Sequence, residues 1–312
     1  MGYWLMKPLS IGSDKKELSF DDVIFPGFAS RKLDGIRACI LNGKVLSNSQ
    51  KPIASLYVQS LFRDLEGFDG ELGYGDPTDP LFYNKTQSAV NSVHWPEDMD
   101  KNELRFYVFD YRVQNTPARA RLEVLKPLVN SLHDLRVVFV EQTLVFNQED
   151  LERLYQTYLS EGYEGLMYKR SGGMYKFGRS GKTDQPLLRM KPFGNEFFEA
   201  KIIGYECAYQ NENDLFYDEQ GFAKRSSHKE NKVPLDMLGA FIVVDCASGI
   251  EFRLPASKMT HAERIDIWKN IDDYLGRYVR YTCLTYGAKV KPRMPSFRGF
   301  RSRTDFSPTG EF

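Results

Sequence analysis

The sequence of 312 residues is long enough for about two domains of ordinary size. Its 42% hydrophobic and 27% charged residues are typical of a folded globular chain and exclude an intrinsically disordered one. No apolar run approaches the roughly 18 residues of a membrane-spanning helix, and the first residues lack the pattern of a secretory signal. The four cysteines stand far apart without a Cys-x-x-Cys pair, so we expect reduced thiols, a cytoplasmic location and no structural zinc.

Positive charge is concentrated in two stretches, although the net charge of the whole chain is zero. Residues 277–304 carry eight Lys or Arg and no acidic residue, and residues 165–191 carry a net charge of +6. Both stretches also contain glycine, proline and aromatic residues, which are typical of loops that approach a ligand closely. We therefore expect a localised site for a polyanion, with two solvated surface faces as the alternative.

Strands and helices are predicted in mixed order over the first part of the chain, from hydrophobic periodicity and turn signals. The predicted strands cover residues 28–33, 36–41, 44–47, 68–74, 106–111, 136–142, 166–169 and 187–191. The predicted helices cover residues 54–65, 117–132 and 149–159, and residues 81–93 are predicted as helix or loop. Asn42-Gly43 is typical of a tight hairpin turn, and Asn147 of a helix N-cap. The mixture predicts an α+β domain with antiparallel sheets rather than a regular doubly wound sheet.

The pattern changes after Pro192-Phe193-Gly194, and we place a domain boundary near residues 192–198. The two predicted domains cover residues 1–194 and 195–312. In the second domain, strands are predicted over residues 199–206, 237–245, 251–254 and 278–286, and one helix over 260–274. Residues 209–232 are too hydrophilic for a core and are predicted as a long loop. The second domain is therefore predicted to be a small β-barrel with one helix.

The strongest local motif is Lys32-Leu-Asp-Gly35-Ile-Arg37, at the end of a predicted strand. A lysine amine attacks phosphorus only when it is uncharged, and neighbouring cations or a metal ion favour that form. Gly35 would let the backbone approach a nucleotide, and Arg37 offers a planar fork of donors to phosphate. Arg31 points to the opposite face of the strand and is the weaker candidate nucleophile. The alternative for this motif alone is a surface turn.

Four further segments place acidic, aromatic or cationic residues on predicted strands. They are Asp69-Gly-Glu71-Leu, Tyr107-Val-Phe109-Asp, Glu164-Gly-Leu-Met167-Tyr-Lys and Arg189-Met-Lys191-Pro. Each segment by itself has a structural interpretation, as core or as a salt-bridged surface. Together they supply a nucleophile, two carboxylates able to bind a metal, a stacking ring and cations for phosphates. This set suits phosphoryl or nucleotidyl transfer, in which positioning and charge neutralisation dominate catalysis.

In this order, K-x-D-G-x-R, D-G-E-L, aromatic-x-F-D, E-G-L-M-x-K and R-x-K-P resemble the motifs of the covalent nucleotidyltransferase superfamily of DNA ligases, RNA ligases and capping enzymes. The segment from Arg293 to Arg301 is similar to the C-terminal motif of small bacteriophage ATP-dependent DNA ligases. The resemblance covers nearly the whole chain. It implies a nucleotidyltransferase (adenylation) domain followed by an OB-fold β-barrel.

The resemblance also implies a reaction and a role for each matching residue. Lys32 would attack the α-phosphate of ATP to form lysyl-AMP, and AMP would then pass to the 5′-phosphate of a nick in double-stranded DNA. Glu71 and Glu164 would bind Mg²⁺ or Mn²⁺. The remaining nucleotide-binding residues implied are Ser30, Arg37, Phe109 and Met167 around the adenosine, and Arg179, Arg189, Lys191, Arg293 and Arg301 at the phosphates.

Three positions depart from the family pattern. Asn48 follows Ser47 where members commonly carry an arginine that serves the nick phosphate. Arg189 stands where lysine is more common, which keeps the positive charge. Ser30 replaces an acid found in some phage members, which leaves mainly backbone contacts to adenine.

The position of Lys32, after only 31 residues, leaves no room for a nicotinamide-recognising domain or a separate N-terminal DNA-binding domain. We therefore expect ATP rather than NAD⁺, and a monomer that clamps DNA between its two domains with a hinge at residues 192–198. The alternatives are an RNA ligase or mRNA-capping guanylyltransferase with the same lysine chemistry, and a non-enzymatic nucleic-acid binder.

Overall fold

The computed structural model describes residues 5–12, 17–192, 197–217, 223–226, 228–284 and 290–301. These residues belong to two compact units, one within residues 5–192 and the other within residues 197–301, each with its own apolar core. The predicted boundary and hinge near residues 192–198 include residues 193–196, which lie outside the described residues.

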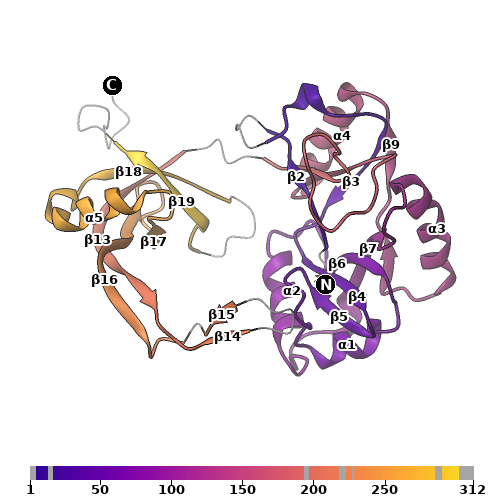
Figure 1. The fold of residues 1–312 in the computed structure, drawn as a ribbon, viewed down its shortest axis with the longest axis horizontal. Helices are drawn as coiled ribbons and strands as arrows, with labels where there is room; N and C mark the ends of the chain where they lie inside the picture. Colours follow the sequence, from indigo (N-terminus) through magenta and orange to yellow (C-terminus); the bar gives the residue numbers. More distant parts are fainter. Residues whose placement is uncertain are drawn as a thin grey trace. The chain divides into compact units, whose positions relative to one another are not determined.

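The first unit contains two five-stranded sheets (Figure 1). The first sheet has the order β5-β4-β6-β7-β8, formed by β4 (Ile36–Leu41), β5 (Lys44–Ser47), β6 (Phe68–Tyr74), β7 (Leu104–Tyr111) and β8 (Val137–Phe139). The second sheet has the order β2-β12-β10-β3-β9, formed by β2 (Leu9–Ser10), β3 (Gly27–Lys32), β9 (Thr143–Val145), β10 (Gly165–Arg170) and β12 (Leu188–Met190). Most neighbouring strands are antiparallel, while the pairs β7–β8 and β2–β12 are parallel. The predicted α+β fold is confirmed.

Helices cover both sheets of the first unit. Those that contact the first sheet are α1 (Leu56–Phe62), α2 (Phe82–Asn91) and α3 (Ala118–Ser131), and α4 (Gln148–Ser160) contacts the second. Short 3₁₀ turns lie at Phe20–Asp22 and Lys101–Glu103. The predicted N-cap of α4 is confirmed, because the side chain of Asn147 accepts a hydrogen bond from the backbone N–H of Asp150 at 2.8 Å. Pro127 lies inside α3.

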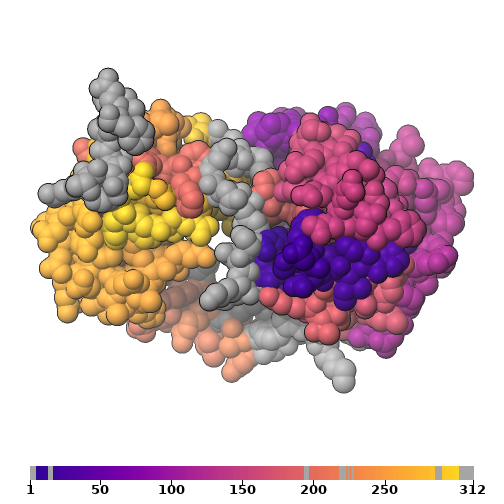
Figure 2. All heavy atoms as spheres, turned by 90° about the horizontal axis from the view of Figure 1, so that it is seen from above, coloured from indigo at the N-terminus to yellow at the C-terminus, as the bar shows by residue number. Residues whose placement is uncertain are grey.

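The N-terminal segment (residues 5–11) pairs with strands from the later part of the first unit. Its strand β1 (Met6–Lys7) pairs in parallel with β11 (Gly178–Arg179), and β2 pairs in parallel with β12. Figure 2 shows these indigo residues against the pink residues of the later strands. Strands of two residues are too short to show periodicity, so the sequence did not predict them.

The second unit is built on one five-stranded antiparallel sheet. Its order is β17-β16-β13-β18-β19, formed by β13 (Phe198–Asn211), β16 (Lys232–Asp245), β17 (Glu251–Pro255), β18 (Tyr278–Leu284) and β19 (Arg293–Phe300). The predicted helix over residues 260–274 is divided into α5 (His261–Lys269) and a 3₁₀ turn at Ile271–Tyr274. Phe241, Leu254 and Tyr281 are among the buried residues of the core.

The predicted long loop over residues 209–232 is wrong for the part of it that the structure describes. Both β13 and β16 extend into this stretch, and β14 (Leu215–Tyr217) pairs with β15 (Ala223–Arg225). The buried side-chain amide of Asn213 donates hydrogen bonds to the carbonyls of Ser226 and His228, at 3.0 and 2.8 Å respectively. Backbone pairing therefore extends the strands, although the side chains are too polar for a core.

Candidate active site

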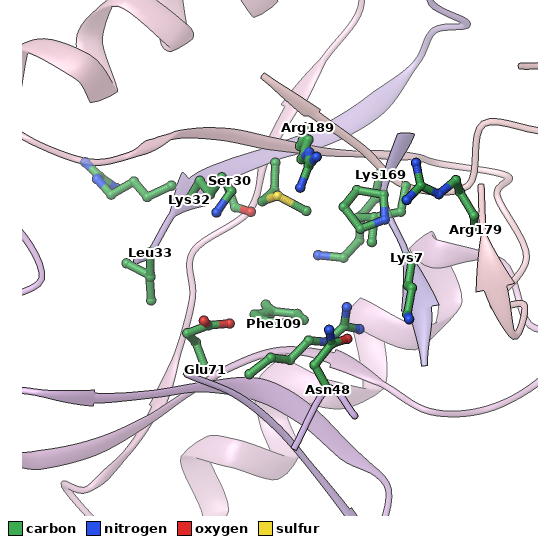
Figure 3. A pocket seen from close by; sticks show the side chains of 15 residues that line it. Lys7, Ser30, Lys32, Leu33, Asn48, Glu71, Phe109, Lys169, Arg179 and Arg189 are labelled. Atoms are coloured by element: carbon green, nitrogen blue, oxygen red, sulfur yellow. The ribbon is translucent and has the colours of Figure 1, made fainter. Parts of the chain in front are cut away.

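A cavity of about 470 Å³ lies between the two sheets of the first unit (Figure 3). Figure 3 shows Ser30, Lys32 and Arg189 on one wall, and Glu71 and Phe109 on the opposite wall. The complete lining is Lys7, Pro8, Ser30, Arg31, Lys32, Leu33, Arg37, Asn48, Glu71, Phe109, Met167, Lys169, Arg179, Leu187 and Arg189. Most of the site residues predicted in this unit therefore line one cavity.

Strand register brings the residues of the first wall together. Met167 on β10 lies opposite Ser30 on β3 and opposite Arg189 on β12. Because side chains alternate along a strand, Lys32 lies on the same face as Ser30, and Lys169 on the same face as Met167. Segments that are far apart in the sequence thus present a single row of polar and cationic groups to the cavity.

The amine of Lys32 contacts the carboxylate of Glu164, which lies immediately before β10. The backbone N–H of Glu164 also donates to the carbonyl of Lys32 at 3.2 Å, which fixes the two residues side by side. Glu164 adjoins the cavity without lining it. The guanidinium of Arg31 pairs instead with Glu161, with 2.9 Å between Nε and Oε2. Lys32 thus contacts a residue of another motif, whereas Arg31 pairs outside the motifs, and the choice of Lys32 over Arg31 as nucleophile stays a prediction.

Two glycines of the motifs allow strands to approach each other. A Cβ atom at Gly35 would lie 2.2 Å from the carbonyl oxygen of Leu72 on β6. A Cβ atom at Gly165, where φ is +151°, would lie 2.2 Å from the carbonyl oxygen of Met190 on β12. The close neighbour of Gly35 is thus the backbone of its own sheet, and the expectation that Gly35 lets the backbone approach a nucleotide stays a prediction.

On the opposite wall, Arg37 and Glu71 are cross-strand partners on β4 and β6. Phe109 is the extra residue of a β-bulge, since Asp69 lies opposite Asp110 and the next residue, Gly70, lies opposite Val108. A bulge redirects a side chain locally. Burial, together with the nearby carboxylates of Glu164 and Asp34, raises the pKa of Glu71 to about 8, against the lowering effect of Lys32 and Arg37.

Arg37 is held by groups of the protein itself. Its Nε and Nη2 donate to the two carboxylate oxygens of Asp69 at 3.0 and 2.7 Å, and its Nη1 donates to the carbonyl of Met6 at 2.7 Å. Burial lowers the pKa of Arg37, but the carboxylate of Asp69 outweighs it and keeps the pKa above the usual range. The guanidinium lies 5.5 Å from the centroid of the Phe109 ring. A role at the ribose or phosphate stays a prediction.

The predicted phosphate-binding cations of this unit gather at or beside the cavity. Nε of Arg189 donates to the hydroxyl of Ser10 at 2.9 Å, and Arg179 is exposed at the cavity edge. Lys191 does not line the cavity. Burial lowers the pKa of Lys191, and the charges that act on it include Glu164, Arg189 and Lys32, so it belongs to the same electrostatic cluster.

Lys7 and Lys169 also line the cavity, although neither was among the predicted site residues. The amine of Lys169 lies 3.3 Å from Oε1 of Gln142 and 5.3 Å from the centroid of Phe109. Burial lowers the pKa of Lys169 to about 8. Lys169 ends the motif that begins at Glu164. It could have been predicted to line the site, because it lies two residues after Met167 and therefore on the same face of the strand. Lys7 had no comparable signal, because only the pairing of β1 brings it to the site.

The predicted triphosphate contacts Arg293 and Arg301 belong to the second unit. Arg293 begins β19, and Arg301 follows its end. Nε of Arg301 lies 2.5 Å from Oε1 of Glu199, and both side chains are about one quarter exposed. Their contact with a nucleotide stays a prediction.

The cavity brings a lysine, a carboxylate, several cations and an aromatic ring together, a set of groups that suits nucleotidyl transfer. The model of the ATP-dependent DNA ligase domain matches residues 19–191, and that of the DNA ligase OB-like domain matches residues 232–301. The chain therefore belongs to the ATP-dependent DNA ligase family. The second match confirms the predicted OB-type second domain.

Individual relatives agree with this assignment. A DNA ligase of African swine fever virus is 30% identical over 152 residues, which are 47% of this chain and 33% of the relative, so the chain spans about a third of that protein. The structure of Chlorella virus DNA ligase-adenylate is 27% identical, covers 96% of this chain and 100% of that one, and has a TM-score of 0.50. A Lig E DNA ligase, 22% identical over 95% of this chain and 99% of that one with a TM-score of 0.66, shares the fold.

Proposed function

We propose that the chain is an ATP-dependent DNA ligase that seals nicks through a lysyl-AMP intermediate on Lys32. The observation that carries this proposal is the position of Lys32, at the end of β3, inside a cavity whose walls carry Phe109, Met167 and several cations. The similar Chlorella virus structure is that of a ligase-adenylate, which supports the same chemistry here.

In the proposed first step, adenine stacks between Phe109 and Met167, which lie on opposite walls of the cavity. The phosphates lie among Arg179, Arg189 and Lys191, whose charges offset the negative charge that develops on them. The uncharged amine of Lys32 attacks the α-phosphorus, so a P–N bond forms, the P–O bond to pyrophosphate breaks, and the amine loses its proton to solvent. Positioning of the amine and charge neutralisation supply the acceleration.

The carboxylates of Glu71 and Glu164 fit a divalent cation such as Mg²⁺ or Mn²⁺. Within the described ranges, no group of three or more His, Cys, Asp or Glu could hold a metal alone. Mg²⁺ usually takes only one or two carboxylates and completes its shell with water and substrate phosphates. Burial raises the pKa of Glu71 to about 8, and the charges of Glu164 and Asp34 add to this effect, so a bound cation would favour the ionised form of Glu71. A bound cation would supply positive charge to the phosphates and favour the uncharged form of the nearby lysine.

In the later steps, AMP passes from Lys32 to the 5′-phosphate at a nick in duplex DNA, and the 3′-hydroxyl displaces it. We propose that the chain acts as a monomer and that its two domains clamp the duplex. The two basic stretches would contact the DNA backbone, so binding should weaken as salt increases. We also propose a cytoplasmic location. No helix in the part of the chain that the structure describes is long and apolar enough to cross a membrane.

Adduct formation tests the reaction directly. After incubation with α-labelled ATP and Mg²⁺, we expect an acid-labile AMP adduct on Lys32, and none on the Lys32→Ala variant. Mass spectrometry should locate the adduct on residue 32. An adduct at another residue would contradict the role of Lys32, and the absence of any adduct would favour the non-enzymatic nucleic-acid binder.

Substrate comparison tests the ligase assignment against the two related enzyme classes. Nicked DNA, a nicked RNA duplex and GTP are offered side by side, and we expect sealing of nicked DNA with ATP. Preferential sealing of the RNA duplex would instead identify an RNA ligase, and transfer of GMP from GTP would identify a capping guanylyltransferase.

A further inference from the structure

A buried network of charged and polar side chains lies next to the cavity and, apart from Arg37, has no role in the proposed chemistry. Arg121 of α3 binds the carboxylate of Asp110 through two hydrogen bonds of 2.7 and 3.0 Å. Asp69 holds Arg37 in the same way and also accepts a hydrogen bond from the hydroxyl of Tyr175 at 2.8 Å. The side chains of Asp69, Asp110, Arg121 and Tyr175 are all at most 1% exposed.

This network connects the two walls of the cavity. Asp69 and Asp110 belong to the first sheet, and Asp110 directly follows Phe109 in the β-bulge. Tyr175 belongs to the segment that follows β10 of the second sheet, the strand that carries Met167. The ring of Tyr175 lies 5.3 Å from the guanidinium of Arg121. The hydrogen bond from Tyr175 to Asp69 therefore joins the side that holds Met167 to the side that holds Phe109.

Packing and backbone contacts reinforce the same connection. Tyr175 belongs to a small buried cluster with Met6 and Leu187, and Met167 packs against this cluster. Nη1 of Arg121 donates to the carbonyl of Gly173 at 3.1 Å, which holds the segment before Tyr175 on α3. A shift of Tyr175 would therefore move both the support of Met167 and the partner of Asp69.

Stability alone is a weak reason for such a network. Buried ion pairs contribute little net stability, because desolvation of the charges offsets their attraction. A network in which each member is satisfied does restrict the geometry of its surroundings. Here the surroundings are the two side chains that would enclose the base.

We propose that Tyr175 and Arg121 are positioning residues, which set the spacing between Phe109 and Met167 and so adjust the slot for the nucleotide base. This inference rests on the proposed function, because it takes the slot between these two side chains as the adenine site. It makes base stacking, rather than phosphate binding, the property that depends on the network.

Equilibrium binding of ATP tests the inference without requiring AMP transfer. In the Lys32→Ala background, we expect Tyr175→Phe to weaken ATP binding roughly five- to tenfold, which is part of what stacking of a base on an aromatic ring contributes. Inorganic tripolyphosphate, which has no base, should bind both proteins equally. Tyr175→Phe keeps the ring, whereas Arg121→Ala would leave the buried carboxylate of Asp110 without its partner and endanger folding.

Tyr168→Phe is the matched control. Tyr168 is also fully buried on β10, and its hydroxyl donates to the carbonyl of Ile24 at 2.7 Å, away from the cavity side of the strand. We expect Tyr168→Phe to leave ATP binding unchanged. Adding Tyr175→Phe to Phe109→Leu should cause little further weakening, because the stacking ring through which Tyr175 acts is already absent.

The inference would be overturned by undiminished ATP binding of Tyr175→Phe, by equal weakening of tripolyphosphate binding, or by full additivity with Phe109→Leu. Absence of ATP binding by the Lys32→Ala parent would overturn it as well. If the unsubstituted chain binds ATP but forms no adduct on Lys32, the proposed reaction fails, and the binding comparison still decides the role of Tyr175.

Discussion

Lys169 is deeply buried and also lines the cavity. Burial favours the uncharged form of its amine, whereas nearby carboxylates favour the charged form. Its amine has an amide oxygen at 3.3 Å and an aromatic ring nearby, and only 2% of the residue is exposed. Asp110 and Asp69 favour the charged form, whereas burial, Arg121 and Arg37 disfavour it. Burial dominates, and the pKa of Lys169 falls to about 8.

We expect this lysine to make stability depend on pH. Its pKa is lower in the folded state than in the unfolded state, so between about pH 8 and pH 10.5 the folded chain binds fewer protons and its stability rises with pH. Below that window the charged amine is buried at a cost. At about pH 7 we therefore expect Lys169→Met to have a higher free energy of unfolding than the parent chain. This difference should decrease by about 2 kcal/mol between about pH 7 and about pH 10.

Chemical denaturation at several pH values measures this difference. The control is Lys126→Met, which removes a half-exposed lysine that pairs with Glu141. If the difference in free energy of unfolding between Lys169→Met and the parent chain stayed constant across the pH range, the lowered pKa of Lys169 would be contradicted.

Gly35 gives a second prediction for a single residue. Gly35→Ala should destabilise the first unit by roughly 2–4 kcal/mol, because the new methyl group would displace the backbone of β6 beside Glu71. Gly172→Ala is the control, since a Cβ atom there meets nothing within 4 Å. Urea unfolding of the two variants provides the measurement. Equal unfolding midpoints would show that β6 shifts to accommodate the methyl group without loss of stability.

The positions of Arg37 and its partner Asp69 show which features of the site can be predicted from a sequence. The motif identified a rigid cationic fork near the nucleophile, and Arg37 does line the cavity. Its partner Asp69 is 32 residues away, and only the register of β4 on β6 brings the two together. Cross-strand register depends on long-range pairing, which a local pattern does not contain.

Among the elements, helix α4 was predicted most closely because its signals are local. Its N-cap, its periodic residues and the glycine after it, Gly162 with φ +92°, all lie within one segment. Strand β9 and the pair β14–β15 were missed, because each has three residues and depends on a partner elsewhere in the chain. The bulge at Phe109 was also beyond reach, since it is defined by two strands together.

The N-cap of α4 offers a test at this scale. Asn147→Ala should cost roughly 1 kcal/mol, because the backbone N–H of Asp150 would lose its acceptor. Since α4 contacts β3 and β10, which carry Lys32 and Met167, adenylation should decline at temperatures near unfolding while remaining normal well below them. Thermal unfolding and adduct formation are compared with those of Gln156→Ala, a change at an exposed position of the same helix. A loss of adenylation at all temperatures would show that α4 acts on the site directly.

At the scale of the whole molecule, the proposed reaction requires residues of the second unit to reach the triphosphate beside Lys32 of the first unit. The predicted triphosphate contacts Arg293 and Arg301 lie on and beside β19, a strand integrated into the sheet of the second unit. Deletion of this segment would remove an entire strand, so a point substitution separates function from folding. We choose Arg293→Ala because Arg293 is the first residue of β19, so the substitution leaves the rest of the strand in place.

If the second domain approaches the triphosphate only during the first step, Arg293→Ala should slow adenylation of Lys32 by about tenfold or more. Sealing of a nick that already carries AMP should change by less than about twofold, because the triphosphate is no longer present. Arg253→Ala, which removes an exposed arginine of the same unit paired with Glu206, should leave both rates unchanged. Single-turnover rates of the two steps provide the comparison. Equal slowing of both steps would contradict the proposal that Arg293 acts on the triphosphate in the first step alone.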